Sequence, residues 1–247
     1  MVGLERALDV VFPRRCAGCG DGTWPFCDAC RHALEPLKPP WCSRCGRPGA
    51  VPVSRCGDCP PEPLTSARAP FRYDGPAKAA IHRLKFSGWR DVGAALAGAM
   101  IASDPPPADV ITWVPLARSR LVERGYDQAR ALAGAIAREL DAPLVRLLRR
   151  VAPTAPQARR RGAERRLAMR DAFAPRRPAP PRILLVDDVL TTGATAAACA
   201  ESLRGAGARE VHLVAAARSL SLRLAAGPAY PRTGPRSGLW LPGDHPR

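Results

Sequence analysis

The stretch ILLVDDVLTTGAT, from Ile183 to Thr195, restricts the folds open to this chain more than any other part of the sequence. Its first four residues form a short apolar run, typical of a central strand in a parallel sheet covered on both faces. Asp187 and Asp188 follow at the expected end of that strand. Gly193 then leads into a helical pattern that ends at further glycines. The stretch therefore predicts strand, loop and helix of an α/β fold.

The same stretch predicts a binding site for a phosphorylated ligand. Ligands of open α/β sheets bind outside the carboxyl ends of the strands, and the N-terminus of a helix favours an anion. Two carboxylates beside a phosphate would repel it unless they bind ribose hydroxyls or share a Mg²⁺ with a diphosphate. A P-loop is excluded because no lysine follows Gly193. An ordinary buried strand with a capped helix would leave the adjacent acids unexplained.

Eight of the nine cysteines form four CxxC pairs in the first quarter of the chain. This spacing suits tetrahedral zinc sites, because each pair can supply two thiolates to one metal. Disulfides are the rival interpretation, but the remainder of the chain reads as an intracellular protein. Sequential pairing into two Cys₄ zinc ribbons is the simplest assignment, and an interleaved pairing stays open. The predicted ligands are Cys16, Cys19, Cys27, Cys30, Cys42, Cys45, Cys56 and Cys59. The ninth, Cys199, reads as a small core residue.

The chain has 247 residues, 46% of them hydrophobic, and a net charge of +16. Nearly all of its 38 basic residues are arginines, which fits either a GC-rich genome or a polyanionic partner such as nucleic acid. The N-terminus lacks the apolar core of a secretory signal, and no apolar run is long enough to cross a bilayer. We therefore expect a cytoplasmic protein without membrane insertion.

Four segments are predicted along the chain. Residues 1–15 read as an amphipathic helix, 16–65 as a double zinc ribbon, 66–222 as an α/β domain and 223–247 as a disordered tail rich in Pro and Arg. Within the α/β domain, strands are expected near Phe71, in DVITWVPL, in LVRLLRR and in REVHLVAAARS, and they alternate with helical patterns. This alternation favours a parallel sheet.

The stretch from Ile183 to Thr195 resembles the phosphoribosyl-diphosphate (PRPP) binding motif of type I phosphoribosyltransferases. A double zinc ribbon followed by such a domain resembles the ComF family, known for members linked to competence and DNA uptake. The stretches IHRLKFSG, VPL and RGYDQA, with Thr154, Gln157 and the dipeptide at Ala172, carry the resemblance across about residues 12 to 220. Ala117 and Asp127 depart from the family pattern.

The resemblance implies roles for particular residues. Asp187 and Asp188 would hold the ribose 2′- and 3′-hydroxyls. Mg²⁺ would bind together with PRPP, and the 5′-phosphate would be wrapped by Thr191, Thr192, Gly193, Ala194 and Thr195. Residues 154–170 resemble the flexible loop that closes over PRPP in this fold, and their arginines fit either a diphosphate or a nucleic-acid backbone.

Several residues near the predicted sheet edge have two interpretations each. Arg118 and Arg120, in the loop expected after VPL, are placed to neutralise pyrophosphate. Arg124 and Gln128 flank a glycine turn and would reach a substrate or cap a helix. Lys85 would contact phosphate or be a solvated charge. His82, on an apolar helix face, reads as a core histidine rather than a catalytic one.

Three functional hypotheses follow. The first is a phosphoribosyltransferase, with Asp187, Asp188, Arg118 and Arg124 as its catalytic residues. The second is a competence factor that binds single-stranded DNA, or a protein of the competence machinery, and uses the fold as a scaffold. The third is a regulator that senses PRPP without chemistry. Fold alone does not choose among them.

Overall fold

The computed structural model describes residues 15–86, 91–151 and 172–220. The predicted N-terminal helix up to residue 14, the loop over 154–170 and the tail over 223–247 lie outside these residues. The described elements, in chain order, are α2 (Asp28–Ala33), β1 (Ser66–Arg68), β2 (Phe71–Arg72), α3 (Gly75–Phe86), α4 (Val92–Ala102), β3 (Val110–Trp113), α5 (Arg118–Arg124), α6 (Gln128–Glu139), β4 (Leu148–Arg150), β5 (Phe173–Pro175), β6 (Arg182–Leu190), α8 (Ala194–Gly205) and β7 (Glu210–Arg218).

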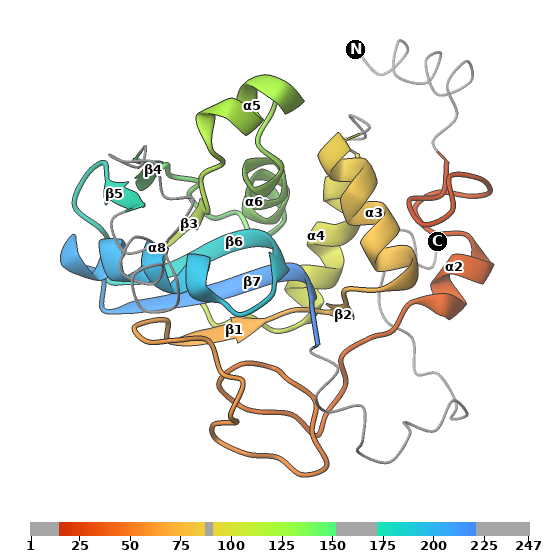
Figure 1. Cartoon of the computed structure of the whole chain (residues 1–247), viewed down its shortest axis with the longest axis horizontal. Coiled ribbons are helices and arrows are strands. Elements are labelled where there is room, and N and C mark those ends of the chain that lie inside the picture. Colours follow the sequence, from red (N-terminus) through yellow and green to blue (C-terminus); the bar gives the residue numbers. More distant parts are fainter. Residues whose placement is uncertain (1–14, 87–90, 152–171, 221–247) are drawn as a thin grey trace, which may run out of the picture.

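A parallel sheet forms the centre of the molecule, as the sequence predicts (Figure 1). Its strand order is β1-β7-β6-β3, and β2 pairs with β7 beyond the end of β1. The central strands β6 and β7 are almost wholly buried because apolar residues fill them. All these pairings are parallel, and the intervening segments supply the helices that cover the sheet.

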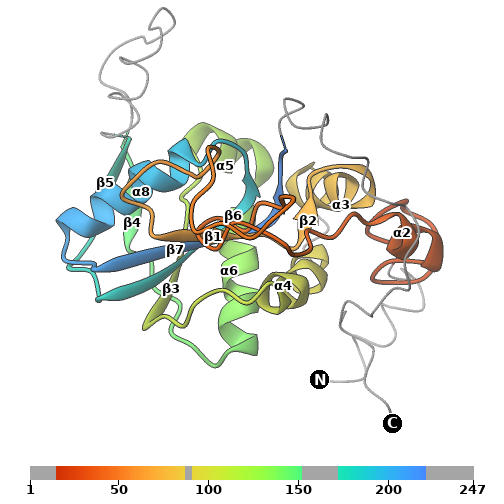
Figure 2. The same ribbon diagram turned by 90° about the horizontal axis from the view of Figure 1, so that it is seen from below.

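Successive residues of β6 enter two different cores. Leu184 and Val186 pack with α3, α4 and α6, whereas Ile183 and Leu185 pack with α8 and with β4 and β5. This alternation follows from the two-residue period of a strand. Figure 2 shows α8 on one side of the sheet and α4 with α6 on the other. Five of the seven alanines and glycines of α4 are buried, which allows close contact with α6.

Both ribbons pack into the cores of the α/β domain. Cys16 and Cys30 are buried in the core that contains α3, while Cys42 and Cys45 are buried in the core that contains α8. Each ribbon therefore contributes apolar packing to a different side of the α/β domain.

Three expectations about local structure need correction. The acids do not follow the strand, because β6 continues through them to Leu190 and pairs with β7 along that length. The segment after VPL is not a loop at Arg118, since Arg118–Arg124 forms α5. The strand in LVRLLRR exists as β4, but it pairs antiparallel with β5 in a separate sheet.

Among the residues that the structure describes, no helix is both long enough and apolar enough to cross a membrane.

Candidate ligand site and metal centres

The paired acids lie where the sheet loses one of its strands. Strand β3 pairs with β6 only as far as Trp113 opposite Val186, whereas β7 continues beside Asp187. The acids therefore lie just beyond the last residue of β6 that pairs with β3. This is the carboxyl edge of the sheet, where ligands of parallel sheets bind.

Asp188 is buried and fully engaged by two side chains. The Nζ of Lys85 lies 2.8 Å from its Oδ1, and the Nε2 of Gln128 donates a 2.9 Å hydrogen bond to its Oδ2. Lys85 is therefore not a solvated charge, because it is the counter-ion of Asp188, and its contact with a phosphate stays a prediction. The ion pair also removes much of the repulsion that two acids would exert on a phosphate.

Asp187 faces a small pocket and keeps partial contact with solvent there, although protein surrounds its other sides. Its Oδ1 accepts a 2.8 Å hydrogen bond from the backbone N–H of Asp188. Burial, followed by the neighbouring charge of Asp188, raises the pKa of Asp187 to about 8. The side chain can therefore be protonated near neutral pH, which suits a group that exchanges hydrogen bonds with hydroxyls.

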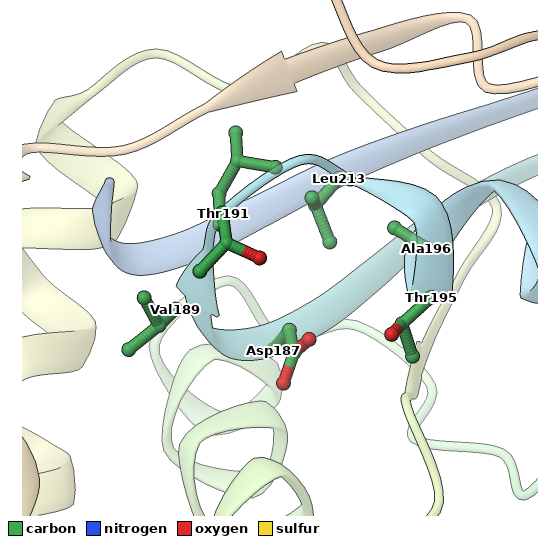
Figure 3. Close-up of a pocket in the computed structure, with 8 residues that line it drawn as sticks. Asp187, Val189, Thr191, Thr195, Ala196 and Leu213 are labelled. Carbon is green, nitrogen blue, oxygen red and sulfur yellow. The ribbon is translucent and has the colours of Figure 1, made fainter. Parts of the chain in front are cut away.

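The predicted anion loop closes the same pocket. Thr191, Gly193 and Thr195 line it together with Asp187, and Figure 3 shows Thr195, on the first turn of α8, on the same side of the pocket as the acid. Gly193 has φ of 76° and caps α8, a twelve-residue helix. Thr192 Oγ1 accepts a 3.4 Å hydrogen bond from the Ala194 N–H.

Gly193 is required for two separate reasons. Its left-handed backbone strains any other residue type. In addition, a Cβ at this position would lie 2.5 Å from the Cβ of Pro60, which directly follows the last cysteine of the second ribbon. The loop therefore packs against the zinc module.

The predicted arginines lie on α5 and not in the pocket. Arg118 is exposed on its first turn, and the guanidinium of Arg124 lies 4.6 Å above the ring of Phe86. His82 is exposed and contacts Phe86 at a ring separation of 4.6 Å, so its prediction as a core histidine is wrong. The helical period explains this, because Ile81 and Leu84 form the buried face of α3.

Asp127 replaces Gln128 as the cap of α6. Its side chain accepts a 3.2 Å hydrogen bond from the N–H of Arg130, and further bonds from Trp113 Nε1 and Leu116 N. Burial raises the pKa of Asp127, against these hydrogen bonds, which lower it. The carboxylate thus joins the end of β3 to α6, which frees Gln128 to reach Asp188.

The cysteines assemble into two groups paired in sequence order, as the simplest assignment predicts. Within each group the four sulfurs lie within 4.8 Å of one another: Cys16, Cys19, Cys27 and Cys30 in one, and Cys42, Cys45, Cys56 and Cys59 in the other. Four thiolates around a tetrahedral zinc at about 2.3 Å would be about 3.8 Å apart. The separations of 3.8 Å for Cys19 and Cys27 and 3.5 Å for Cys45 and Cys56 fit zinc and exclude disulfides.

The surroundings of the sulfurs also fit metal-bound thiolates. Burial acts to raise the pKa of Cys16, but backbone N–H groups at Cys19, Cys27 and Gly18 lower it to about 6. In the same group, burial raises the pKa of Cys30 to about 12. Thiolates this close cannot all ionise without a cation between them, and zinc would supply that charge.

The described residues offer no comparable site for Mg²⁺. Only the two cysteine groups place three or more candidate ligands within reach of one ion across 15–86, 91–151 and 172–220. Asp188 is already bound by Lys85 and Gln128. Mg²⁺ at this pocket would therefore have to arrive with the oxygens of a diphosphate.

Two contacts at the site escaped the sequence interpretation. Pro60 packs on Gly193, and Arg218 at the end of β7 is buried and donates to the carbonyls of Cys45 and Asp58. No local motif marks Pro60. Arg218 carries a weak signal, since it ends the last predicted strand and so falls at the carboxyl edge.

Comparisons with known proteins agree with the zinc module and extend over most of the chain. Residues 7–60 match the double zinc ribbon domain. The chain is 30% identical over 209 residues to the DNA utilization protein YhgH of Salmonella typhi, covering 80% of this chain and 92% of that protein. It is 30% identical over 213 residues to competence protein F of Haemophilus influenzae, with 78% and 90% covered. Competence protein ComFC of Bacillus subtilis is 29% identical over 182 residues, with 68% and 73% covered.

Among solved structures, a glutamine PRPP amidotransferase from B. subtilis aligns with a TM-score of 0.39 at 23% identity. The alignment covers 54% of this chain and only 30% of that enzyme.

Proposed function

This chain belongs to the ComF family, with competence protein F and the DNA utilization protein YhgH, and we propose that its α/β domain binds PRPP or a related ribose phosphate. One observation carries the proposal. Asp187 shares a pocket with Thr191, Gly193 and Thr195, at the junction of the central strand and a helix N-terminus. Hydrogen-bond acceptors for ribose and donors for phosphate thus face each other.

The charges around the pocket favour this ligand over a free cation. Lys85 neutralises Asp188, and the raised pKa of Asp187 leaves that group able to be uncharged near neutral pH. The phosphate end of a ligand would meet the exposed backbone and hydroxyls at Thr191 and Thr192. A ribose phosphate satisfies both ends, whereas inorganic phosphate would leave the acid without a partner.

The chemistry that follows is transfer of the phosphoribosyl group to an acceptor. A nucleophile would attack C1′ of the ribose while pyrophosphate leaves, and Mg²⁺ bound to the diphosphate would stabilise the departing charge. The protein's part is to fix the ribose through Asp187, beside an Asp188 that Lys85 and Gln128 hold in place, and the 5′-phosphate through the loop. Arg118 and the basic segment 154–170 are further candidates for holding the diphosphate.

Calorimetric titration with PRPP and Mg²⁺ tests the proposal. We expect binding by the zinc-loaded protein and its loss in an Asp187→Asn/Asp188→Asn double variant. Asp109→Asn is the matched control, because Asp109 pairs with Arg182 at the opposite edge of the sheet. Failure of a folded wild-type protein to bind would refute both the transferase and the PRPP sensor. Binding without pyrophosphate release, across a panel of acceptors, would favour the sensor.

Single-stranded DNA binding is a second candidate, favoured by the exposed Phe86. This residue is 55% exposed, the guanidinium of Arg124 lies 4.6 Å from its ring centroid, and bases stack on aromatic rings and guanidinium planes. Phe86→Ala should weaken binding of a labelled oligonucleotide, and the affinity should fall steeply with salt. Binding that is indifferent to Phe86 and to salt would contradict this function.

A further inference from the structure

The second zinc ribbon ends against the anion loop. Cys59 is its last ligand, and the next residue, Pro60, is buried on Gly193. The contact is so close that the Pro60 ring occupies the space of a Cβ at Gly193. Pro61, the next residue, is exposed.

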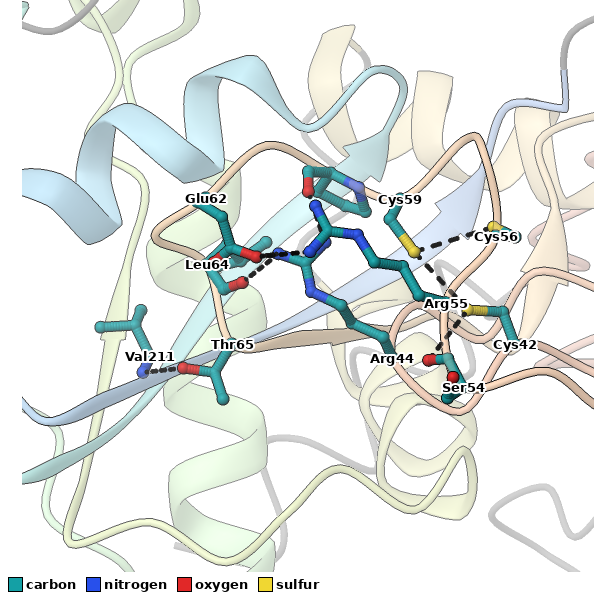
Figure 4. Close-up of polar contacts among 11 residues, drawn as sticks. Cys42, Arg44, Ser54, Arg55, Cys56, Cys59, Glu62, Leu64, Thr65 and Val211 are labelled. Carbon is teal, nitrogen blue, oxygen red and sulfur yellow. Dashed lines mark hydrogen bonds and ion pairs between the residues drawn. The ribbon is translucent and has the colours of Figure 1, made fainter.

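The chain after the ribbon is held in place by Arg44, which lies in sequence between the zinc ligands Cys42 and Cys45. Arg44 Nη1 donates to the carbonyl of Pro60 at 2.8 Å, and Nη2 donates to the carbonyl of Leu64 at 2.6 Å. Its guanidinium also pairs with Glu62 at 3.0 Å. Figure 4 shows these contacts beside the cluster of sulfurs. The position of Pro60 is therefore set by a residue of the ribbon itself.

The other end of the loop is tied to the same ribbon through Arg218. This buried side chain donates to the carbonyl of Cys45 at 2.6 Å and to the carbonyl of Asp58 at 3.0 Å. The backbone of Arg218 pairs with Leu190, the residue before the loop, and the next N–H, of Ser219, donates to the Leu190 carbonyl at 2.9 Å. The loop is thus linked to the second ribbon at two places, directly where Gly193 packs on Pro60 and indirectly where Leu190 pairs with Arg218.

We propose that the second zinc ribbon is a structural part of the ligand site, with Pro60 and Arg218 as residues that position the loop from Thr191 to Thr195. Zinc at Cys42, Cys45, Cys56 and Cys59 holds the two carbonyls that Arg218 binds and the turn that carries Pro60. The first ribbon packs on α3 instead, through Arg83, which donates to the carbonyls of Ala17 and Gly18. The identity of the bound ligand rests on the proposed function, but the order of the loop does not.

Hydrogen exchange of two backbone amides, measured by NMR without PRPP, tests the coupling. The Ala197 N–H donates to Gly193 and the Ser219 N–H donates to Leu190, so they report on the two ends of the loop. Cys56→Ser and Cys27→Ser each remove one half-buried ligand, one from each ribbon. We expect both variants to lose one zinc, and both amides to exchange about tenfold faster in Cys56→Ser alone. Equal exchange in the two variants would overturn the proposal.

A second pair of variants keeps every zinc ligand. It therefore separates the effect of Pro60 on the loop from unfolding caused by loss of zinc. Pro60→Gly should speed exchange of the Ala197 amide with two zinc ions still bound, whereas Pro61→Gly should leave it unchanged. An unaltered Ala197 amide in Pro60→Gly would refute the positioning role. PRPP affinity, measured afterwards, should fall about tenfold in Pro60→Gly. A wild-type protein that does not bind PRPP would refute the proposed function, and the exchange result would still decide the coupling.

Discussion

The ion pair between Lys85 and Asp188 allows a direct test of how a buried carboxylate beside Asp187 is stabilised in the folded protein. The two charged atoms are 2.8 Å apart, and the side chains are 18% and 9% exposed. Breaking a buried pair by removing one partner costs about 3–5 kcal/mol, because it leaves an uncompensated charge. Gln128 keeps its hydrogen bond to Asp188, so we expect the lower value, about 3 kcal/mol, for Lys85→Met. For a chain of this size that is a fall in Tm of about 6–12 °C.

A second substitution separates this cause from lost packing. Asp188→Asn removes the stranded charge and keeps the acceptor oxygen for Gln128, so adding it to Lys85→Met should restore about 2 kcal/mol. Lys78→Met is the control, because Lys78 is exposed on the same helix and its loss should change stability by less than about 0.5 kcal/mol. The measurement is urea and thermal unfolding of the zinc-loaded proteins at pH 7. If Lys85→Met matched Lys78→Met, or if Asp188→Asn made it less stable, the reasoning would be refuted.

Three further outcomes are expected. Because the pKa of Asp187 is raised to about 8 in the folded protein and is about 4 when unfolded, stability should fall as pH rises from about 4 to 8. Asp187→Asn should make Tm depend less on pH between pH 5 and 9. If Tm of the variant fell with pH as steeply as Tm of the wild type, the raised pKa of Asp187 would be contradicted. Asp127→Ala should lose about 1–3 kcal/mol in urea unfolding, and Asp127→Asn much less, since Asn also caps helices. Chelation should release two zinc ions per chain and lower Tm, and release of one would contradict the two-site assignment.

The features that could be predicted from sequence are those with a local physical signature. The apolar run before Asp187 specifies a buried strand, and CxxC spacing specifies which sulfurs can share a metal. Helix α5 cannot be predicted in this way, because it buries no residue and so has no apolar period. Strand β4 was assigned without its sheet, since two of its three residues are exposed and no pattern indicates its partner.

The site residues that sequence could not connect are separated by long stretches of chain. Lys85 comes from α3, Gln128 from the start of α6, and both meet Asp188 on β6. Each is a polar residue at or next to a helix terminus, where the sequence does not distinguish a solvated side chain from a functional one. The sheet order brings α3 and α6 to the same face of the sheet. Only this arrangement shows that Lys85 and Gln128 contact Asp188 and are not solvated.

The two ribbons act on different halves of the proposed site. The first is bonded to Arg83 on α3, two residues before the lysine that neutralises Asp188. The second is packed on Gly193, which shapes the anion loop. Loss of zinc from the first ribbon should therefore disturb the acid end of the pocket, and loss from the second the phosphate end. A small module without a large core of its own is thus stabilised by metal and, in turn, holds two separated elements of a ligand site in register.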